Sequence, residues 1–515
     1  MSAQSAVAPA GVAQHRRRAG VLAAYRAERS KLTAQLATRV LALACGLAPF
    51  AFGAVLALQS GVPADTLLGV WVHESGYAVS FVVLGFCGYL GFPVLAGVLA
   101  GDVLSSEDRY GTWKSVLTRS RSRGELFAGK CLTVLVLAAG LLALTATSSL
   151  LSGLIFSGGH AMVGLAGNVV PGGEALWLLV LSWLVSLPPL LAFASLAILL
   201  SVASRSGIVG VVGPVLVGLV MQLLALVGSG SWMHDLLITN AFAGWHGLLA
   251  GPRFYVPLLI ATGVSLAWIA ACLAAAWAML RRRDFAGPPV SRHSGWIAPA
   301  RAATAIAALV VLLGLAGGAG PATVTRARLE ASLATVFQRL TALQQSELGR
   351  PVPAGAQLGL LTRCFRHAGR SVGPGDDWSC SLTLVHPAGG PEALQTTNVT
   401  YDMSVRSEGC YKAQAPPSFV GSQTMIDAHG RSVVNPLFSI YGCFDTSAAA
   451  PRPAPGPPHR SEPRPSAVQR EAERHSLQQA ERQAGPKVMS EIREAEHQEQ
   501  RNAEGPEGAA QPRAR

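Results

Sequence analysis

Long hydrophobic runs without a charged residue fill most of the chain before residue 325. About 20 consecutive apolar residues are enough for a helix to cross the hydrocarbon core of a membrane. Only 14% of the 515 residues are charged, whereas soluble globular proteins carry about 25%. The runs therefore predict membrane-spanning helices. Counting uncharged residues predicts seven spans, at residues 40–59, 77–100, 131–156, 175–202, 207–227, 255–280 and 302–319.

The distribution of Lys and Arg between the loops predicts which side each loop faces, because basic loops stay in the cytoplasm. One set of loops holds the N-terminal arginines, the basic loop 102–130, Arg205 and the arginines 281–283. The opposite short loops hold Asp65, Glu74, Glu174 and Asp235, with Arg253 as the lone basic residue. We therefore expect a multi-pass protein of the cell (plasma) membrane with a cytoplasmic N-terminus and an extracytoplasmic C-terminal domain.

The formal net charge of +12 does not indicate a nucleic-acid partner, because the basic residues lie at the ends of hydrophobic runs. No basic patch interleaved with aromatic residues is visible in a soluble region. No Asp, Glu, Lys or Arg lies near the middle of a predicted span. Most ion-coupled transporters need such residues, although some use backbone carbonyls instead. The absence of charged residues from the middle of the predicted spans disfavours an ion-coupled transporter and fits a membrane protein that is driven from outside the bilayer.

Composition divides the chain into six regions. Residues 1–38 form a cytoplasmic segment, 39–283 hold six spans, 284–301 form a cytoplasmic linker and 302–320 contain the seventh span. Residues 321–446 predict a small α+β extracytoplasmic domain. Residues 447–515 are Pro-rich and highly charged, which predicts a disordered tail. The expected fold class is an all-α polytopic membrane protein with one small α+β domain.

Two segments leave alternatives open. In the first, Val21, Leu22, Tyr25, Leu32 and Leu36 recur at near-helical spacing. An amphipathic helix at the membrane interface and an ordinary basic lead-in to the first span explain this pattern equally well. The second, residues 236–252, is apolar but too short to cross the membrane. It predicts either a re-entrant or interfacial helix or a plain outer loop.

The C-terminal domain is expected to contain a helix over 324–347, followed by strands at 379–386, 399–405, 424–427 and 437–443. It holds Cys364, Cys380, Cys410 and Cys443. Four cysteines in one extracytoplasmic region predict two disulfides. Pairing of neighbours gives Cys364–Cys380 and Cys410–Cys443, although four cysteines allow three connectivities.

One short motif suggests nucleotide binding and is rejected. Residues 124–130, together with Cys131, match G-x-x-x-x-G-K up to its last position. A phosphate-binding loop needs a preceding strand, a following soluble helix and a Ser or Thr that holds magnesium. Here a basic loop precedes, a membrane span follows, and Cys131 stands at the metal-ligand position. We expect no ATPase, no catalytic or metal site and no cofactor in this chain.

The loop 102–130 is the longest charged interruption between spans and carries the most specific pattern. Fourteen of its residues follow a motif that resembles the ABC-2 family of transporter permeases. They are Glu107, Gly111, Thr112, Trp113, Lys114, Leu117, Thr118, Arg119, Ser122, Arg123, Glu125, Leu126, Gly129 and Lys130. Ser120 stands where that family usually has Pro. The segment 25–32 also resembles the family's N-terminal segment, so the resemblance covers residues 20 to about 283.

The resemblance implies a permease subunit that is moved by a separate cytoplasmic ATP-binding subunit, where ATP would bind. The family works as dimers of six-span units, which implies a homodimer or a second permease within the lipid. The coupling loop would contact the ATPase through Gly111, Thr112, Trp113, Lys114, Leu117, Arg119, Arg123 and Glu125. From the residues alone, a basic loop that anchors to anionic lipid headgroups explains the same stretch equally well. A non-transporting membrane sensor or scaffold, with a ligand-binding outer domain, is the alternative function.

Overall fold

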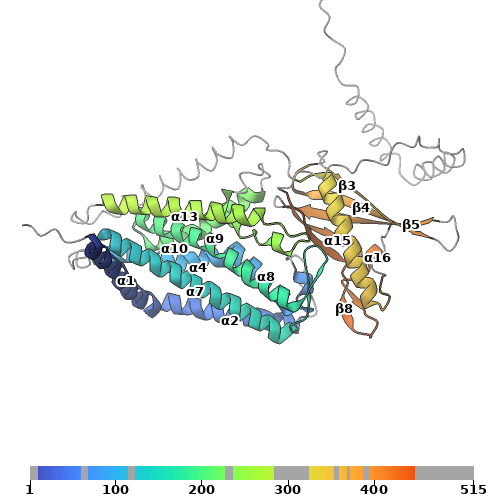
Figure 1. Cartoon of the computed structure of the whole chain (residues 1–515), viewed down its shortest axis with the longest axis horizontal. Helices are drawn as coiled ribbons and strands as arrows, with labels where there is room; N and C mark the ends of the chain where they lie inside the picture. The colour runs from blue at the N-terminus through green and yellow to red at the C-terminus, as the bar shows by residue number, and fades with distance from the viewer. Residues whose placement is uncertain are drawn as a thin grey trace, which may run out of the picture. The chain divides into compact units, whose positions relative to one another are not determined.

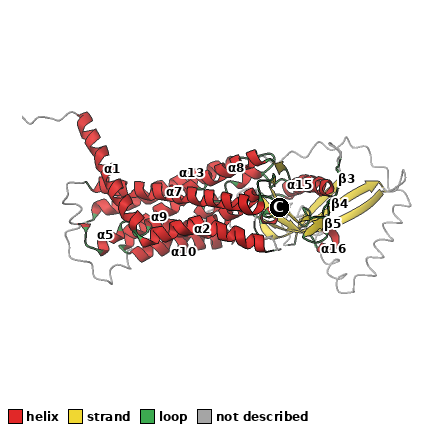
Figure 2. Cartoon of the chain, turned by 90° about the horizontal axis from the view of Figure 1, so that it is seen from below, coloured by secondary structure: helices red, strands yellow, loops and turns green. Residues whose placement is uncertain are grey.

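The computed structural model describes most of the chain up to residue 446. The described residues are 10–59, 66, 68–113, 122–226, 236–283, 324–352, 359–367, 372–387, 394–406 and 409–446. Three predicted regions therefore lie outside the described residues: the linker 284–301, the seventh span 302–320 and the tail 447–515. The described part is mostly helical, with the strands gathered towards its C-terminal end (Figure 1, Figure 2).

Among the described residues, six helices are long and apolar enough to cross a membrane. They are α2 (Leu36–Leu58), the pair α3–α4 (Gly76–Phe86 and Phe92–Ala100), α7 (Arg123–Ser157), the pair α8–α9 (Gly172–Val185 and Leu187–Ser204), α10 (Gly207–Leu226) and α13 (Val256–Arg282). Their positions confirm the first six predicted spans. The chain is thus a polytopic membrane protein with a small strand-rich region.

Small residues let these helices approach closely, which is how helices pack where there is no hydrophobic effect between them. A Cβ added to Gly76 would lie 2.4 Å from the carbonyl carbon of Gly153, and one added to Gly101 would lie 2.3 Å from that of Gly210. These contacts fasten the second span to the third near one end and to the fifth near the other. The hydroxyls of Ser80 and Ser149 bond each other at 2.6 Å inside the bundle.

Two of the spans are not regular α-helices throughout. A π-helical turn, Cys87–Gly91, separates α3 from α4. The side-chain amide of Gln222 on α10 donates to the carbonyl of Tyr89 in this turn, so a neighbouring helix satisfies a backbone group there. The fourth span breaks between α8 and α9, where Leu187 is followed by two prolines. These prolines stand in the first turn of α9, where a missing backbone N–H breaks no helical hydrogen bond, whereas Pro49 in α2 and Pro214 in α10 lie inside continuous helices.

The segment between the fifth and sixth spans is packed among the spans. It contains α12 (Ile238–Ala241) and a short 3-10 helix, His246–Leu249. The ring of Phe242 lies 5.2 Å from that of Phe92 and 6.0 Å from that of Phe193. Trp245 stacks on Phe81 at 5.4 Å. Because these aromatic side chains are buried against the second and fourth spans, the segment is not a plain outer loop.

The N-terminal segment is a single helix, α1 (Ala10–Ala34), which lies along the start of α7 (Figure 1). Its buried positions are Ala24, Glu28 and Leu32, four residues apart. The apolar stripe predicted from the sequence is only partly buried, because Leu22 and Leu36 are exposed. α1 therefore packs on the bundle through Ala24, Glu28 and Leu32, and the exposure of Leu22 and Leu36 fits both interpretations of this segment.

The strand-rich region is an antiparallel sheet covered by one helix. The helix is α15 (Arg326–Glu347), whose predicted apolar positions Leu329, Leu333, Phe337 and Leu340 are buried. The strands are β3 (Gly359–Arg366), β4 (Gly375–Pro387), β5 (Leu394–Val405), β6 (Cys410–Gln414) and β9 (Ser439–Cys443), paired in that order. The region also contains a hairpin of β7 (Thr424–Ile426) and β8 (Ser432–Val434) and the short helix α16 (Pro417–Val420). The loop between the third and fourth spans forms a separate two-stranded pair, β1 (Met162–Val163) with β2 (Val169–Val170).

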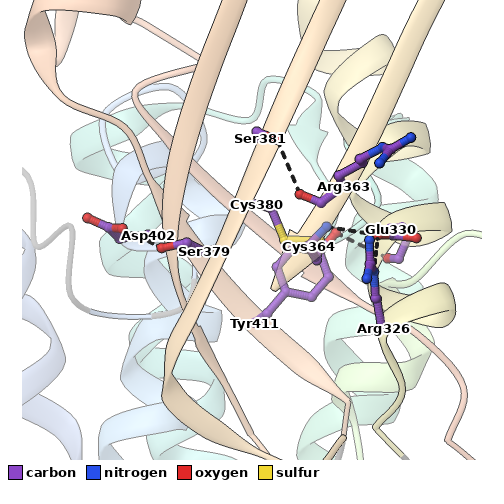
Figure 3. Close-up of a disulfide and its surroundings, with 10 residues drawn as sticks. Arg326, Glu330, Arg363, Cys364, Ser379, Cys380, Ser381, Asp402 and Tyr411 are labelled. Carbon is purple, nitrogen blue, oxygen red and sulfur yellow. Dashed lines mark hydrogen bonds and ion pairs between the residues drawn. A yellow bond between two sulfur atoms is a disulfide. The ribbon is translucent and has the colours of Figure 1, made fainter. Parts of the chain in front are cut away.

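The sheet carries two disulfides, Cys364–Cys380 and Cys410–Cys443. Each joins directly opposed residues of neighbouring strands, and the pairing of neighbours is therefore confirmed. The first disulfide lies between the sheet and α15 (Figure 3). There the backbone N–H of Cys364 donates to Glu330 at 2.8 Å, and Arg326 donates to the same carboxylate. The disulfide thus joins β3 to β4, and the hydrogen bond from Cys364 to Glu330 joins β3 to α15.

Candidate functional site

Four charged side chains from α1, α5 (Ser105–Arg109) and α7 meet at one end of the bundle. These residues, named here the charge cluster, are Glu28, Lys31, Glu107 and Lys130. The Nζ of Lys130 lies 2.9 Å from Oε1 of Glu28 and 3.2 Å from Oε1 of Glu107. The Nζ of Lys31 lies 2.8 Å from the same oxygen of Glu107. Each carboxylate thus faces both ammonium groups, and the net charge of the cluster is zero.

Three members of the charge cluster, Glu28, Glu107 and Lys130, are buried and must therefore be paired, whereas Lys31 lies at its more exposed edge. The side chain of Lys130 is only 4% exposed, and it also donates to the carbonyl of Val103 at 2.9 Å. Burial raises the pKa of Glu107, but Lys130, Lys31 and the Thr112 hydroxyl outweigh that effect and lower the pKa to about 2. Burial lowers the pKa of Lys31, and the two carboxylates reverse this and raise it. Glu107 and Lys31 are therefore both ionised at neutral pH.

Gly129 allows α1 to reach the charge cluster. A Cβ on Gly129 would lie 2.6 Å from the Cβ of Ala24 and 3.0 Å from the backbone nitrogen of Tyr25. The helices therefore cross where only glycine fits, one residue before Lys130. Residues 124–130 lie within the first turns of the continuous helix α7. In this structure the Gly-Lys pair provides a close helix crossing and a buried cation.

Replacing Gly129 by Ala is expected to weaken the contact between α1 and α7. Overpacking of a close contact costs about 1–3 kcal/mol, which should lower the midpoint of thermal unfolding and expose α1 to trypsin. Gly140 on the same helix is the matched control, because a Cβ there would meet nothing within 4 Å. If the Gly129→Ala and Gly140→Ala variants unfold and are cleaved alike, the close crossing is wrong.

The ionisation of Glu107 predicts a dependence of stability on pH. Because its pKa in the folded chain is about 2 rather than the ordinary 4.5, Glu107 stabilises the fold fully above pH 4.5. That contribution is lost progressively as the pH falls from 4.5 towards 2. The wild-type midpoint of unfolding should therefore fall more over this range than that of the Glu107→Gln variant. Parallel curves for the two proteins would contradict the assignment.

A second set of contacts joins the loop to the end of α13. Arg283 donates to both carboxylate oxygens of Asp108 on α5, at 2.5 and 2.8 Å. Arg123, at the start of α7, donates to the carbonyls of Arg281 and Arg283, each at 3.0 Å. The loop is therefore fixed to α1 on one side and to the sixth span on the other.

The structure brings together only some of the predicted coupling residues. Thr112 donates to Glu107, Arg123 bonds to the end of α13, and Glu125 closes a capping box with Ser122 at the start of α7. Gly111 has φ = +64°, a conformation that favours glycine. Trp113 is buried within the chain, so it does not offer its indole as a docking surface. Lys114, Leu117 and Arg119 lie outside the described residues.

Sequence reasoning missed most of the charge cluster as a unit. Glu107 and Lys130 belong to the loop motif, but Glu28 and Lys31 lie about 75 to 100 residues earlier in the chain. Both belong to the segment 25–32 that resembles the family's N-terminal segment, but their spacing of three residues on one helix face is typical of any solvated helical ion pair and points to no distant partner. The ion pair between Asp108 and Arg283 was missed for the same reason, because the two residues lie 175 positions apart in the sequence.

Among the described residues of the strand-rich region, Ser379 has two polar neighbours whose order differs from that of a catalytic triad. Ser379 donates to Asp402 at 3.0 Å, and its hydroxyl lies 3.1 Å from Nε2 of His367. In a catalytic triad the histidine stands between the serine and the carboxylate, whereas here the serine stands between the other two. Within the described ranges, no group of three His, Cys, Asp or Glu side chains is placed to hold a metal ion.

The six-span part of the chain is similar to a known protein family. A family model described as "Protein of unknown function (DUF2705)" matches residues 53–286. The matched range runs from within α2 to just beyond α13 and includes the loop 102–130, whereas α15 and the sheet lie outside it. No curated protein matches the chain.

Proposed function

We propose that this chain is the transmembrane permease subunit of an ABC-2-type transporter that exports its substrate, with ATP hydrolysed by a separate ATP-binding subunit. The observation that carries the proposal is the buried charge cluster. Glu107 and Lys130 belong to the motif that resembles the ABC-2 coupling loop, and both are ion-paired with the N-terminal helix. A force on the loop would therefore move α1, α7 and α13 together.

The geometry of α7 supports this proposal. α7 is a continuous helix of 35 residues, which corresponds to about 50 Å at the usual rise per residue. Its first turns hold Lys130 and the capping box, and its last turns pack on Gly76 at the opposite end of the second span. A displacement at the charge cluster can thus reach the far ends of the spans through one rigid element.

We infer that the end bearing the charge cluster faces the cytoplasm and that the strand-rich region lies outside the cell. Two independent features support this orientation. Lys and Arg are concentrated in the loops at the charge-cluster end, and disulfides such as the two in the sheet persist in oxidising compartments. The same orientation would place the loop 102–122 within reach of a cytoplasmic ATPase.

The apolar surfaces of the bundle support a second permease subunit or direct lipid contact. α2, α10 and α13 bury few of their residues within the chain. Large apolar side chains such as Leu47, Leu223 and Leu259 are exposed on them. A homodimer or a pair with another permease would cover part of this surface, and membrane lipid would cover the rest.

A non-transporting sensor or scaffold is the second candidate, favoured by the disulfide-bonded domain, which a minimal six-span permease does not need. Purification of the full chain from its native membrane in mild detergent separates the two. The transporter proposal expects stoichiometric co-purification of a protein that carries a phosphate-binding loop and binds ATP. A chain that purifies without any ATP-binding protein, in detergents that keep it folded, would favour the sensor.

A further inference from the structure

The strand-rich domain makes polar contacts with all three loops at the end of the bundle opposite the charge cluster. The backbone N–H of Val434 donates to Oε1 of Glu74, in the loop between the first and second spans, at 3.1 Å. Nη1 of Arg339 on α15 lies 3.1 Å from the carbonyl of Ala166, between the third and fourth spans. The same atom lies 3.5 Å from the carbonyl of Gly251, between the fifth and sixth spans.

Arg339 is therefore a bridge between two loops that are far apart in the sequence. These two loops also bond directly, because the N–H of Leu165 donates to the carbonyl of Leu249 at 2.9 Å. If the ends of the spans separated, the two carbonyls would move apart and one guanidinium nitrogen could no longer reach both. The contact is specific for the arrangement in which the loops lie together.

The loop between the third and fourth spans is shaped to fit under α15. Gly167 has φ = +66°. A Cβ there would lie 3.1 Å from Cγ of Leu340 and from the carbonyl oxygen of Val336. Only glycine combines this backbone conformation with so close an approach. The sequence of the loop is thus adapted to the helix that covers it.

A fourth contact reaches a span directly. Arg406, just after β5, donates to the hydroxyl of Tyr89 in the π-helical turn of the second span. Its guanidinium also lies over the Tyr89 ring, 6.0 Å from the centroid, which adds a cation–π attraction. The domain thus holds the second span both through Glu74 and through Tyr89.

We propose that the strand-rich domain is a clamp that holds the three loops together and must release them before this end of the bundle can open. Where the chain is a transporter, which rests on the function proposed above, the clamp is the gate on the exit side. The contact itself does not depend on transport, so it is tested on the chain alone.

Hydrogen exchange of the full chain in lipid nanodiscs tests the clamp. Arg339→Ala removes the bridge, and the amides of residues 162–170 and 246–255 should then exchange about tenfold faster, as expected when one charge-assisted hydrogen bond is lost. Arg326→Ala is the matched control, because Arg326 lies on the same helix but pairs with Glu330 within the domain. Unchanged exchange in Arg339→Ala, or an equal increase in both variants, would overturn the clamp.

Cross-linking in intact membranes gives a second, independent readout. A His73→Cys and Val433→Cys pair, which keeps the Glu74 contact, should form an intramolecular cross-link with a short bis-maleimide, and its yield should fall several-fold when Arg339→Ala is added. No cross-link in the otherwise native chain would contradict docking of the domain. Neither readout involves ATP, so failure to find an ATP-binding partner would remove the transporter proposal and leave the clamp standing. The background should lack the four span cysteines, Cys45, Cys87, Cys131 and Cys272.

Discussion

Replacing Lys130 by Met is expected to detach α1 from the rest of the bundle. Met keeps most of the length of the side chain but removes its charge, which leaves Glu28 and Glu107 buried with only the more exposed Lys31 between them. Removing one partner of a buried ion pair costs about 3–5 kcal/mol, because the remaining charge is uncompensated. The midpoint of thermal unfolding should fall, and trypsin should cleave α1 rapidly at Arg26 and Arg29.

Two further variants make this result specific to the charge cluster. Lys31→Met removes a cation whose side chain is 37% exposed, and exposed pairs contribute about 1 kcal/mol or less. A triple variant, Glu28→Gln, Glu107→Gln and Lys130→Met, removes all the buried charges and should recover much of the lost stability. Equal effects of Lys130→Met and Lys31→Met, or no recovery in the triple variant, would show that the cluster is not a buried ionic unit.

Removing the first disulfide is expected to unfold part of the strand-rich domain. Cys364 and Cys380 are separated by 16 residues, and a disulfide that closes a loop of about 15 residues stabilises a fold by about 3 kcal/mol. The Cys364→Ala, Cys380→Ala variant should therefore show faster hydrogen exchange in β3, in β4 and in the covering helix α15. Treatment of the wild-type chain with a reductant should reproduce the change.

The control for this prediction is Cys131→Ala, which removes a free cysteine and should leave exchange in the domain unchanged. Alkylation of the unreduced wild-type chain should label none of the four domain cysteines. Labelling of all four in the folded chain would contradict both the disulfides and the extracytoplasmic placement that they support.

The spans were predictable because the requirement for about 20 apolar residues acts locally. The start of α7 was not. The span count placed it at Cys131, whereas the helix begins at Arg123, because a capping box and buried ion pairs stabilise two polar turns that a count of uncharged residues excludes. The charge cluster was unpredictable for a related reason. Its geometry depends on α1 folding back along α7, and no period in the sequence encodes that tertiary contact.

The strand-rich domain shows where strand patterns fail. The helix α15 and strands β4, β5, β7 and β9 were predicted; the apolar residues of α15 follow one face and those of β4 and β5 alternate. β3, β6 and β8 were missed. β3 carries Arg363 and Arg366 among its apolar residues, and β6 is a short segment with Lys412 in its middle. Cross-strand pairing and a disulfide hold these strands, so their own composition says little about them.

We propose that ATP hydrolysed by a partner subunit acts on this chain through the loop 102–122. The most direct test compares ATP hydrolysis by the purified complex for two proline variants. Gly111 and Gly430 both have positive φ, face open space and donate an N–H to a carbonyl three residues earlier. Pro suits neither conformation, so Gly111→Pro and Gly430→Pro disturb equivalent turns in different places.

In lipid nanodiscs, we expect the wild-type chain to stimulate ATP hydrolysis by its partner and the Gly430→Pro variant to retain this stimulation. Gly111→Pro should lose most of it while remaining inserted and folded, as judged by its unfolding midpoint. Equal stimulation by both variants would contradict the coupling role of the loop, and a wild-type complex without ATP hydrolysis would contradict the transporter itself.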